Sequence, residues 1–116
     1  MSKKLGIIGG SGLYEIPGVD ILESHELDTP WGAPSAPVFE CKFKEQRFFF
    51  LSRHGMDHSI SPSKINYRAN IDAFKKLGVT DVLSLSSVGS LNEDLLPGVF
   101  VVINQYIDFT KNRIST

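Results

Sequence analysis

The chain is short of several residue types and patterns, and each shortage excludes a class of protein. Its 116 residues include a single cysteine, Cys41, so an internal disulfide is excluded. Its 12 basic residues are balanced by 13 acidic ones, without the basic excess typical of nucleic-acid binding. It lacks both the run of about 18 apolar residues that a membrane helix needs and the apolar segment of a signal peptide. These absences predict a cytoplasmic protein with neither nucleic acid nor membrane as a partner.

What is present is typical of a globular domain. Hydrophobic residues make up 41% of the chain, enough for one modest core. Short apolar or alternating runs predict strands, and one stretch with apolar residues at i, i+4 and i+7 predicts a helix. The predicted strands cover residues 5–8, 38–43, 47–52, 82–86 and 99–106, and the predicted helix covers residues 64–77.

Local signals refine these elements. The strands at 38–43 and 47–52 are separated by a short polar break and predict a hairpin, whose denser second strand is the more central. Ser63 is a candidate N-cap for the helix, and Gly78 is a candidate residue for its C-terminal turn. A further turn is expected at residues 97–98, a Pro-Gly pair.

The order of elements predicts the α/β class, with a mixed β-sheet flanked by helices. Central strands this apolar need cover on both faces of the sheet, and one long helix cannot supply it. We therefore expect the chain to be incomplete or to be covered by a partner.

The first loop able to bind a ligand covers residues 9–12, is Gly-Gly-Ser-Gly and follows the first strand. Its backbone N–H groups and the Ser11 hydroxyl suit an anion. The loop fails the dinucleotide fingerprint because Glu15 stands where a third glycine is wanted, and it lacks the Lys of a P-loop. A plain strand-ending turn explains it equally well.

The second loop contains Arg53 and His54, directly after a buried strand. A buried arginine is costly unless it meets an anion, and its planar fork suits phosphate. His54 can add a hydrogen bond. The alternative is a solvated Arg-His pair at a turn. A metal pair of His54 and His58, with Asp57 nearby, is less favoured, because no set of ligands completes it.

The third loop, residues 86–90, clusters hydroxyl and N–H groups at the end of another strand. Its alternative reading is a helix start capped by serine, which is itself compatible with an anion. Ligands bind at the carboxyl ends of strands in open α/β sheets. The three loops together therefore predict a site for a tetrahedral oxyanion, with no metal.

Five segments resemble one family over essentially the whole chain, in order and at similar spacing. These are Gly-Gly-Ser-Gly-Leu at 9–13, Asp-Thr-Pro-Trp-Gly at 28–32, Ser-Arg-His-Gly at 52–55, Pro-Ser-Lys-Ile-Asn-Tyr-Arg-Ala-Asn at 62–70 and Val-Gly-Ser-Leu at 88–91. They resemble the methylthioadenosine phosphorylase branch of the purine nucleoside phosphorylases. The resemblance implies that residues 1–116 are the N-terminal part of a single nucleoside phosphorylase domain, whose C-terminal half is absent.

The family's phosphate contacts match five residues of this chain: Ser11, Arg53, His54, Ser86 and Ser87. The family more often has threonine in the first loop, and threonine followed by alanine in the third. Serine at positions 11 and 86 keeps the hydroxyl. Ser87 adds one where the phosphate meets the sugar, which affects the choice of substrate.

The resemblance implies phosphate-dependent cleavage of 5'-methylthioadenosine to adenine and 5-methylthioribose 1-phosphate, a pentosyltransferase reaction of purine salvage. It implies a homotrimer, with inorganic phosphate as co-substrate and no cofactor. No catalytic residue is expected within these 116 residues, so the chain alone should be inactive.

Other readings stay open. One is a phosphorylase of 6-oxopurine nucleosides or methylthioinosine, and another is a truncated, non-catalytic module for anion binding or assembly. A nicotinamide-dependent oxidoreductase is disfavoured by the failed glycine fingerprint.

Overall fold

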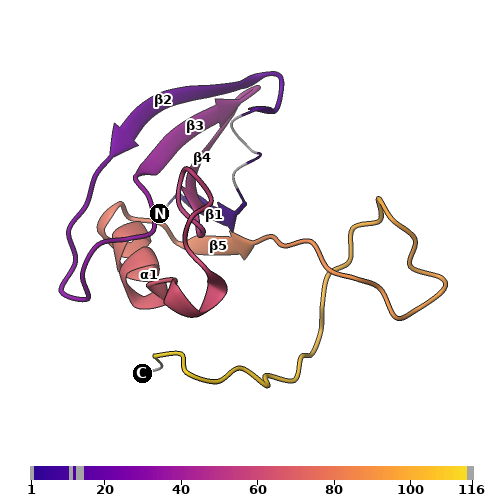
Figure 1. The fold of residues 1–116 in the computed structure, drawn as a ribbon. Coiled ribbons are helices and arrows are strands. Elements are labelled where there is room, and N and C mark those ends of the chain that lie inside the picture. The colour runs from indigo at the N-terminus through magenta and orange to yellow at the C-terminus, as the bar shows by residue number, and fades with distance from the viewer. Residues whose placement is uncertain (1, 11, 13–14, 115–116) are drawn as a thin grey trace. The chain divides into compact units, whose positions relative to one another are not determined.

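The computed structural model describes residues 2–10, 12 and 15–114. The chain divides into two compact units, one ending at Ser86 and the other beginning at Ser87. The first unit contains a five-stranded sheet and one α-helix among its described residues (Figure 1). No helix in the described part of the chain has the length and apolar character of a membrane span.

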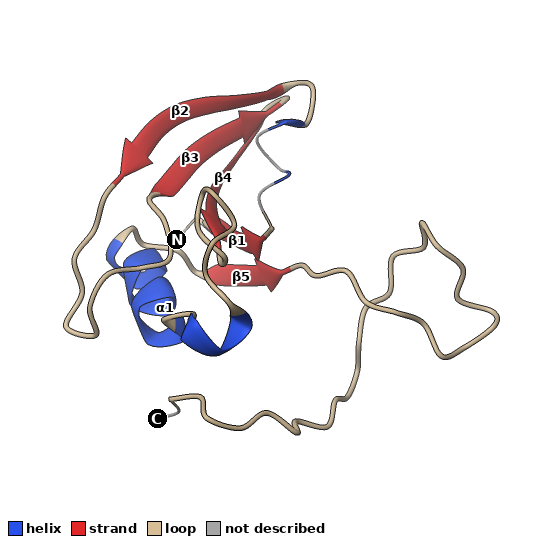
Figure 2. Ribbon diagram, in the orientation of Figure 1, coloured by secondary structure: helices blue, strands red, loops and turns tan. Residues whose placement is uncertain are grey.

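The sheet is mixed, as the sequence predicts. Its strand order is β2-β3-β4-β1-β5 (Figure 2). Strand β1 runs parallel to both β4 and β5, whereas β3 is antiparallel to β4 and to β2. The strand bounds are β1 Leu5–Gly9, β2 Val19–His25, β3 Val38–Phe43, β4 Gln46–Ser52 and β5 Asp81–Ser84.

Four of the predicted strands are confirmed, including the β3–β4 hairpin with β4 at the centre of the sheet. Strand β2 is the one that the sequence did not predict. Its residues, Val-Asp-Ile-Leu-Glu-Ser-His, neither alternate cleanly nor form an apolar run, and most of them are exposed. An edge strand of this kind depends on hydrogen bonds to its neighbour, which leave no pattern in the side chains.

The helix is shorter than predicted and begins at a different cap. Helix α1 spans Tyr67–Lys76, and its N-cap is Asn66, whose side chain accepts a hydrogen bond from the N–H of Ala69. Ser63 lies instead in a separate 3₁₀ turn, η2, at Pro62–Lys64, after which Ile65 is extended. The predicted Gly78 follows the helix with φ +80°, a conformation that favours glycine.

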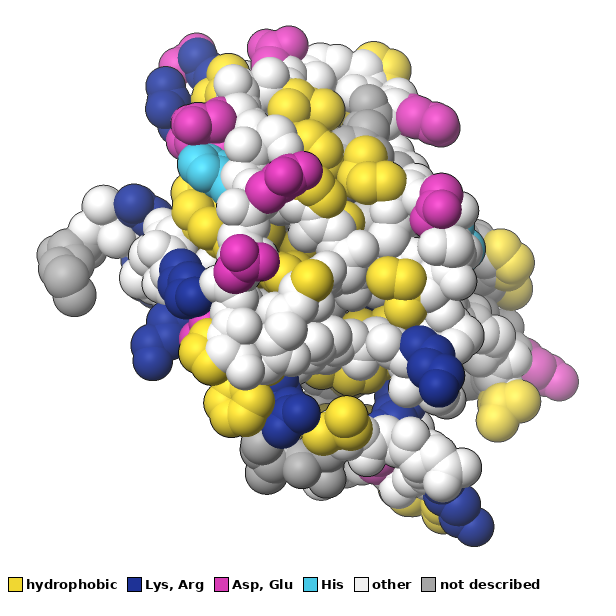
Figure 3. Space-filling model, turned by 60° about the vertical axis from the view of Figure 1, so that its left-hand side comes forward, with side chains coloured by type: hydrophobic (Ala, Val, Ile, Leu, Met, Phe, Trp, Pro, Cys, Tyr) yellow, Lys and Arg dark blue, Asp and Glu magenta, His cyan; other side chains and the backbone are white. Residues whose placement is uncertain are grey.

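The core lies between α1 and one face of the sheet. It consists of Val38, Leu51, Ala73 and Phe74, all at most 1% exposed. Gly6 allows this packing, since a Cβ there would lie 2.8 Å from the Phe74 ring. The opposite face keeps large apolar side chains exposed, including Ile21 and Leu83. Apolar side chains also reach the surface among charged ones in Figure 3. On that same face Cys41 and Phe50 are only 1% exposed, so among the described residues the expected lack of cover appears at the edge strands β2 and β5 and not at the centre of the sheet.

Three residues at the N-terminal end of α1 hold the proline-rich loop at 28–37 in place. The amide of Asn66 donates to the carbonyl of Trp31 at 2.8 Å. Asn70, which is 1% exposed, accepts from the Ser35 N–H at 2.8 Å and donates to the Ser35 hydroxyl at 3.1 Å. Arg68 stacks over the Trp31 ring at 4.6 Å. The loop is irregular but well bonded.

The second unit differs from its prediction. The turn at residues 97–98 is confirmed, because Val99 N–H bonds the Leu96 carbonyl at 3.3 Å and Gly98 has φ +91°. The strand predicted at 99–106 is wrong: the described residues of this unit form no strand. Phe100 and Val102 are 94% and 97% exposed. The segment has strand-like residues but no neighbouring strand with which to bond.

Candidate functional site

Three parallel strands end together at one edge of the sheet. The register of β4, β1 and β5 brings Ser52 beside Gly9, and Ser84 beside Ile8. Two backbone bonds continue the pairing beyond the strands, from Arg53 N–H to Gly9 carbonyl at 3.1 Å and from Leu85 N–H to Ile8 carbonyl at 2.8 Å. The three loops identified in the sequence therefore leave the sheet side by side, at the carboxyl ends of its strands.

Arg53 links two of these loops. Its Nη1 donates to the carbonyl of Leu85 at 2.5 Å, across the end of β1. This contact uses one of the five N–H donors of a guanidinium, and it holds the charged fork over the strand ends. The arrangement resembles an anion site more than a solvated surface arginine, since the side chain is partly buried and anchored to the backbone.

His54 is held from both its ring and its backbone. Its Nδ1 lies 2.8 Å from the carbonyl of Ile60, and its own carbonyl accepts from the Ile60 N–H at 3.0 Å. A carbonyl oxygen can only accept, so Nδ1 carries the hydrogen. The other nitrogen, Nε2, therefore accepts a hydrogen bond when the ring is neutral and donates one when the ring is protonated.

Arg53 and His54 are the two central residues of a turn that is closed by hydrogen bonds between Ser52 and Gly55. The buried Ser52 hydroxyl donates to the Gly55 carbonyl at 3.0 Å, and Gly55 N–H donates to the Ser52 carbonyl at 3.2 Å. Gly55 has φ +84°, where any other residue would be strained. The sequence did not reveal this structural use of Ser52, because a serine at a strand end has many possible partners.

The His54–His58 pair is a ring contact. The two centroids lie 4.8 Å apart at an interplanar angle of 40°, and Nδ1 of His54 is already used. Asp57 accepts hydrogen bonds from the Ser59 hydroxyl at 2.6 Å and from the Ser59 N–H at 3.2 Å. These bonds hold the pKa of Asp57 below its ordinary value. This segment is organised as a turn around its own side chains.

The three serines predicted to bind phosphate lie in different parts of the chain. Ser86 directly follows Leu85, whose N–H and carbonyl are both bonded at the strand edge, and belongs to the first unit. Ser87 is the first residue of the second unit and is exposed there. Ser11 lies outside the described residues. The helix start considered for residues 86–90 does not form among the described residues of that unit.

A second group of ligating side chains lies on β2 and β3. Glu23, His25 and Glu40 offer donor atoms that all lie within 4.8 Å of one another. The sequence did not single out this group, because β2 was not predicted. A Glu-x-His pair on a recognised strand would have been the available signal, since residues two apart share one face of the sheet.

Cys41 is buried on β3, next to Glu40 in sequence but on the opposite face of the sheet. Burial, with a smaller contribution from Glu40, raises the pKa of its thiol to about 11. The thiol therefore stays protonated near neutral pH, and we give it no role as nucleophile or ligand.

Comparison with known proteins identifies the family of the chain. The model of the phosphorylase superfamily matches residues 4–115. An S-methyl-5'-thioadenosine phosphorylase of Bradyrhizobium diazoefficiens is 48% identical over 112 residues, which are 97% of this chain and 38% of that protein. A probable S-methyl-5'-thioinosine phosphorylase of Xanthomonas campestris is 46% identical over 97% of this chain and 45% of its own length.

The chain is also similar to solved structures of methylthioadenosine phosphorylases. Methylthioadenosine phosphorylase from Schistosoma mansoni, in complex with adenine, is 43% identical with a TM-score of 0.88, over 99% of this chain and 42% of that one. A methylthioadenosine phosphorylase from an antarctic soil metagenomic library gives a TM-score of 0.74 over 83% of this chain and 33% of that one. The chain thus spans less than half the length of the relatives it matches.

Proposed function

Because this chain belongs to the phosphorylase superfamily, we propose that the whole protein cleaves 5'-methylthioadenosine with phosphate, releasing adenine and 5-methylthioribose 1-phosphate. The observation that carries the proposal is Arg53, anchored across the ends of three parallel strands with His54 beside it. Relatives bearing this activity in their names, at 46–48% identity, favour the same reaction.

In the proposed reaction, phosphate is the nucleophile and attacks the anomeric carbon as the purine leaves. Arg53 binds the phosphate charge and His54 orients it through Nε2, while Ser11, Ser86 and Ser87 supply hydroxyl donors. The bound anion also stabilises the positive charge that develops on the sugar. We assign protonation of the leaving purine to residues outside these 116. Inorganic phosphate is then a co-substrate, and the reaction uses no cofactor.

The tautomer of His54 gives the phosphate contact a proton requirement. With hydrogen on Nδ1, a neutral ring meets the phosphate with a lone pair on Nε2. The contact then needs either a protonated ring or a hydrogen on the phosphate oxygen. Productive binding of phosphate is therefore tied to one shared proton at Nε2.

A second substrate is favoured by one particular observation. The Xanthomonas relative, named as a probable methylthioinosine phosphorylase, is almost as similar to this chain as the methylthioadenosine phosphorylases are. The residues proposed to bind phosphate would serve either purine equally, because they contact the phosphate that attacks the sugar and not the base. A 6-oxopurine substrate is thus the alternative within the same mechanism.

We also propose that residues 1–116 are the N-terminal part of a single catalytic domain and that the whole protein is a cytoplasmic homotrimer. Support for the trimer comes from the family resemblance, and support for the compartment from the unpaired Cys41. The alternative of another class is a non-catalytic module that binds anions or assembles through its sheet. A stable 116-residue product in cells, without a longer form, would favour the module.

The test is phosphate-dependent release of base by the longest protein that the gene encodes. Methylthioadenosine, methylthioinosine, adenosine and inosine are compared as substrates. We expect methylthioadenosine to be cleaved fastest, and Arg53→Ala to lower kcat/KM by about 100-fold or more, because a charged contact to the nucleophile is lost. The matched control is Arg47→Ala at the opposite end of β4, which should leave kcat/KM nearly unchanged. Equal rates for the two variants would exclude Arg53 from the phosphate site.

A further inference from the structure

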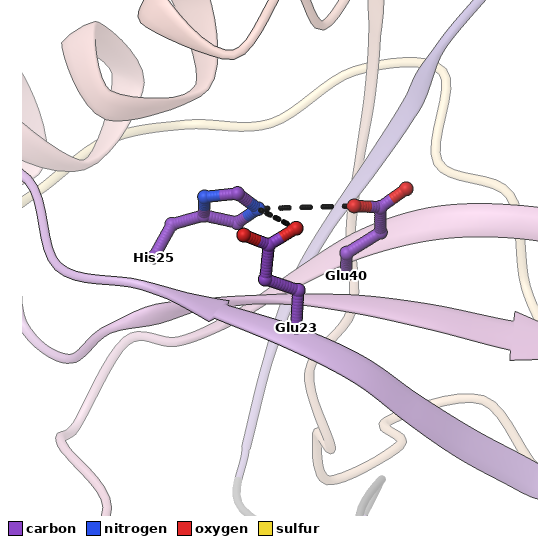
Figure 4. A group of neighbouring side chains, drawn as sticks. All are labelled: Glu23, His25 and Glu40. Carbon is purple, nitrogen blue, oxygen red and sulfur yellow. Dashed lines mark ion pairs between the residues drawn. The ribbon is translucent and has the colours of Figure 1, made fainter.

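Glu23, His25 and Glu40 converge on one point although they come from two strands (Figure 4). Glu23 and Glu40 are cross-strand partners in the β2–β3 ladder, and His25 lies two residues beyond Glu23 on the same face. A register irregularity between Ile21 and Glu23 precedes the group. Such bulges re-aim side chains, and this one precedes the pair that faces Glu40.

The atom at the centre of the group is His25 Nε2. It is buried and has no hydrogen-bond partner, and it lies 3.8 Å from one oxygen of Glu23 and 3.8 Å from one oxygen of Glu40. The His25 ring leans on Phe49, with centroids 6.1 Å apart, which helps to hold its direction. Together with the two carboxylates, this ring nitrogen provides three atoms of the kind that bind metal ions.

The distances fit a bridging cation better than a bridging proton. A charge-assisted N–H···O bond would be about 2.7–2.9 Å long. Two ligands on a tetrahedral ion, with bonds of about 2.0–2.1 Å, lie roughly 3.4 Å apart. The observed 3.8 Å is closer to the second value. Small rotations of the two flexible Glu side chains close the remaining gap.

Charge and donor type indicate which cation. Two carboxylates and one neutral imidazole carry two negative charges, which match a divalent ion. Glu40 uses its other oxygen, Oε1, for an ion pair with Arg47 at 3.7 Å, so Oε2 stays directed at the group. An imidazole donor disfavours Mg²⁺ and Ca²⁺, whereas Zn²⁺ accepts histidine with carboxylates and completes its tetrahedron with water.

We propose that Glu23, His25 and Glu40 form a divalent-cation site that takes Zn²⁺ and ties the edge strand β2 to β3. The sequence predicted no metal, because it did not reveal that β2 pairs with β3 here. The ion would stabilise the exposed edge of the sheet and is independent of the proposed phosphate chemistry.

The test is a Zn²⁺ titration of the purified full-length protein by calorimetry, in buffer free of phosphate and chelators. We expect one ion per chain, and a melting temperature raised by about 5 °C when zinc is in roughly 100-fold excess over its dissociation constant. Glu23→Gln and His25→Gln should each weaken zinc affinity by about 10-fold or more. Glu23 is exposed at the sheet edge, so its variant should fold normally, as circular dichroism would check.

Two controls separate this site from other zinc ligands. Glu45→Gln removes an exposed carboxylate from the β3–β4 turn and should bind zinc like the unmodified protein. His58→Gln disrupts the His54–His58 pair and should also leave the affinity unchanged. Loss of binding in His58→Gln alone, unchanged binding in Glu23→Gln and His25→Gln, or no binding by the unmodified protein would each overturn the proposal.

Discussion

Strand β4 and the segment at residues 99–103 are alike in sequence and opposite in structure. Both contain apolar runs, with three consecutive phenylalanines in β4 and mainly β-branched residues in the other segment, and both patterns predict strands. In β4, Phe50 and Leu51 are at most 1% exposed, and the strand pairs with β1 and β3. In the other segment, Phe100 is 94% exposed, and the described residues form no strand.

The difference shows that a strand is a property of a pair. A helix satisfies its backbone internally, but a strand needs the N–H and carbonyl groups of a neighbour. Strand β4 has neighbours on both sides and a helix over one face. Residues 99–103 have the right side chains and no such neighbour within their own unit. Their apolar side chains therefore stay exposed in this unit.

The largest test of this comparison removes an aromatic ring from each region. Phe74→Ala empties the core between α1 and the sheet and should lower the free energy of unfolding by about 3–5 kcal/mol. Phe100→Ala should change it by less than about 0.5 kcal/mol, because the ring is exposed. Urea denaturation followed by circular dichroism measures both. Similar losses would mean that the second unit is packed after all.

A smaller test compares two asparagines. Asn70→Ala removes both hydrogen bonds to Ser35 from a buried position, and should cost about 1–3 kcal/mol by leaving the Ser35 N–H unpaired. Asn92→Ala removes an exposed bond to the Asp94 N–H, and should cost less than about 0.5 kcal/mol. The same denaturation experiment applies. A neutral Asn70→Ala would show that the proline-rich loop is held mainly by Asn66 and Arg68.

The smallest effect concerns Asp57 in the turn after β4. Its hydrogen bonds from Ser59 hold its pKa below the ordinary value, so they stabilise the folded state above the ordinary carboxyl pKa. That contribution is lost as pH falls through the lowered folded pKa. Ser59→Ala should move the Asp57 pKa up toward its ordinary value, as an NMR titration of its carboxyl carbon would show. An unmoved pKa would assign the lowering to a cause other than Ser59.

Much of the first unit could be predicted from sequence. The runs that became β1, β3, β4 and β5 are marked by their own apolar side chains, although β5 itself is exposed, and Gly78 ends α1 through its own backbone freedom. The cap at Asn66 and the strand β2 could not be predicted. Asn66 is chosen partly by its bonds to Trp31 and Ala33, far away in the chain, and β2 is chosen by pairing with β3.

The candidate sites follow the same division. Arg53 and His54 stand out because charged and titratable groups follow a buried strand, which is a local signal. The bond from Arg53 to Leu85 and the tautomer of His54 are contacts that only the fold creates. The Glu23–His25–Glu40 group was missed for the same reason, since its third ligand lies on another strand.

The sequence by itself determined which residues could enter a sheet or a core and which loop carries the guanidinium, because hydrophobicity, charge and backbone freedom belong to each residue. Only the tertiary structure decided the strand order, the cap of α1 and the convergence of three loop starts at one edge. It also decided that residues 99–106 form no strand in this chain. Those outcomes depend on hydrogen bonds and packing between segments far apart in sequence, whose free energy no single segment contains.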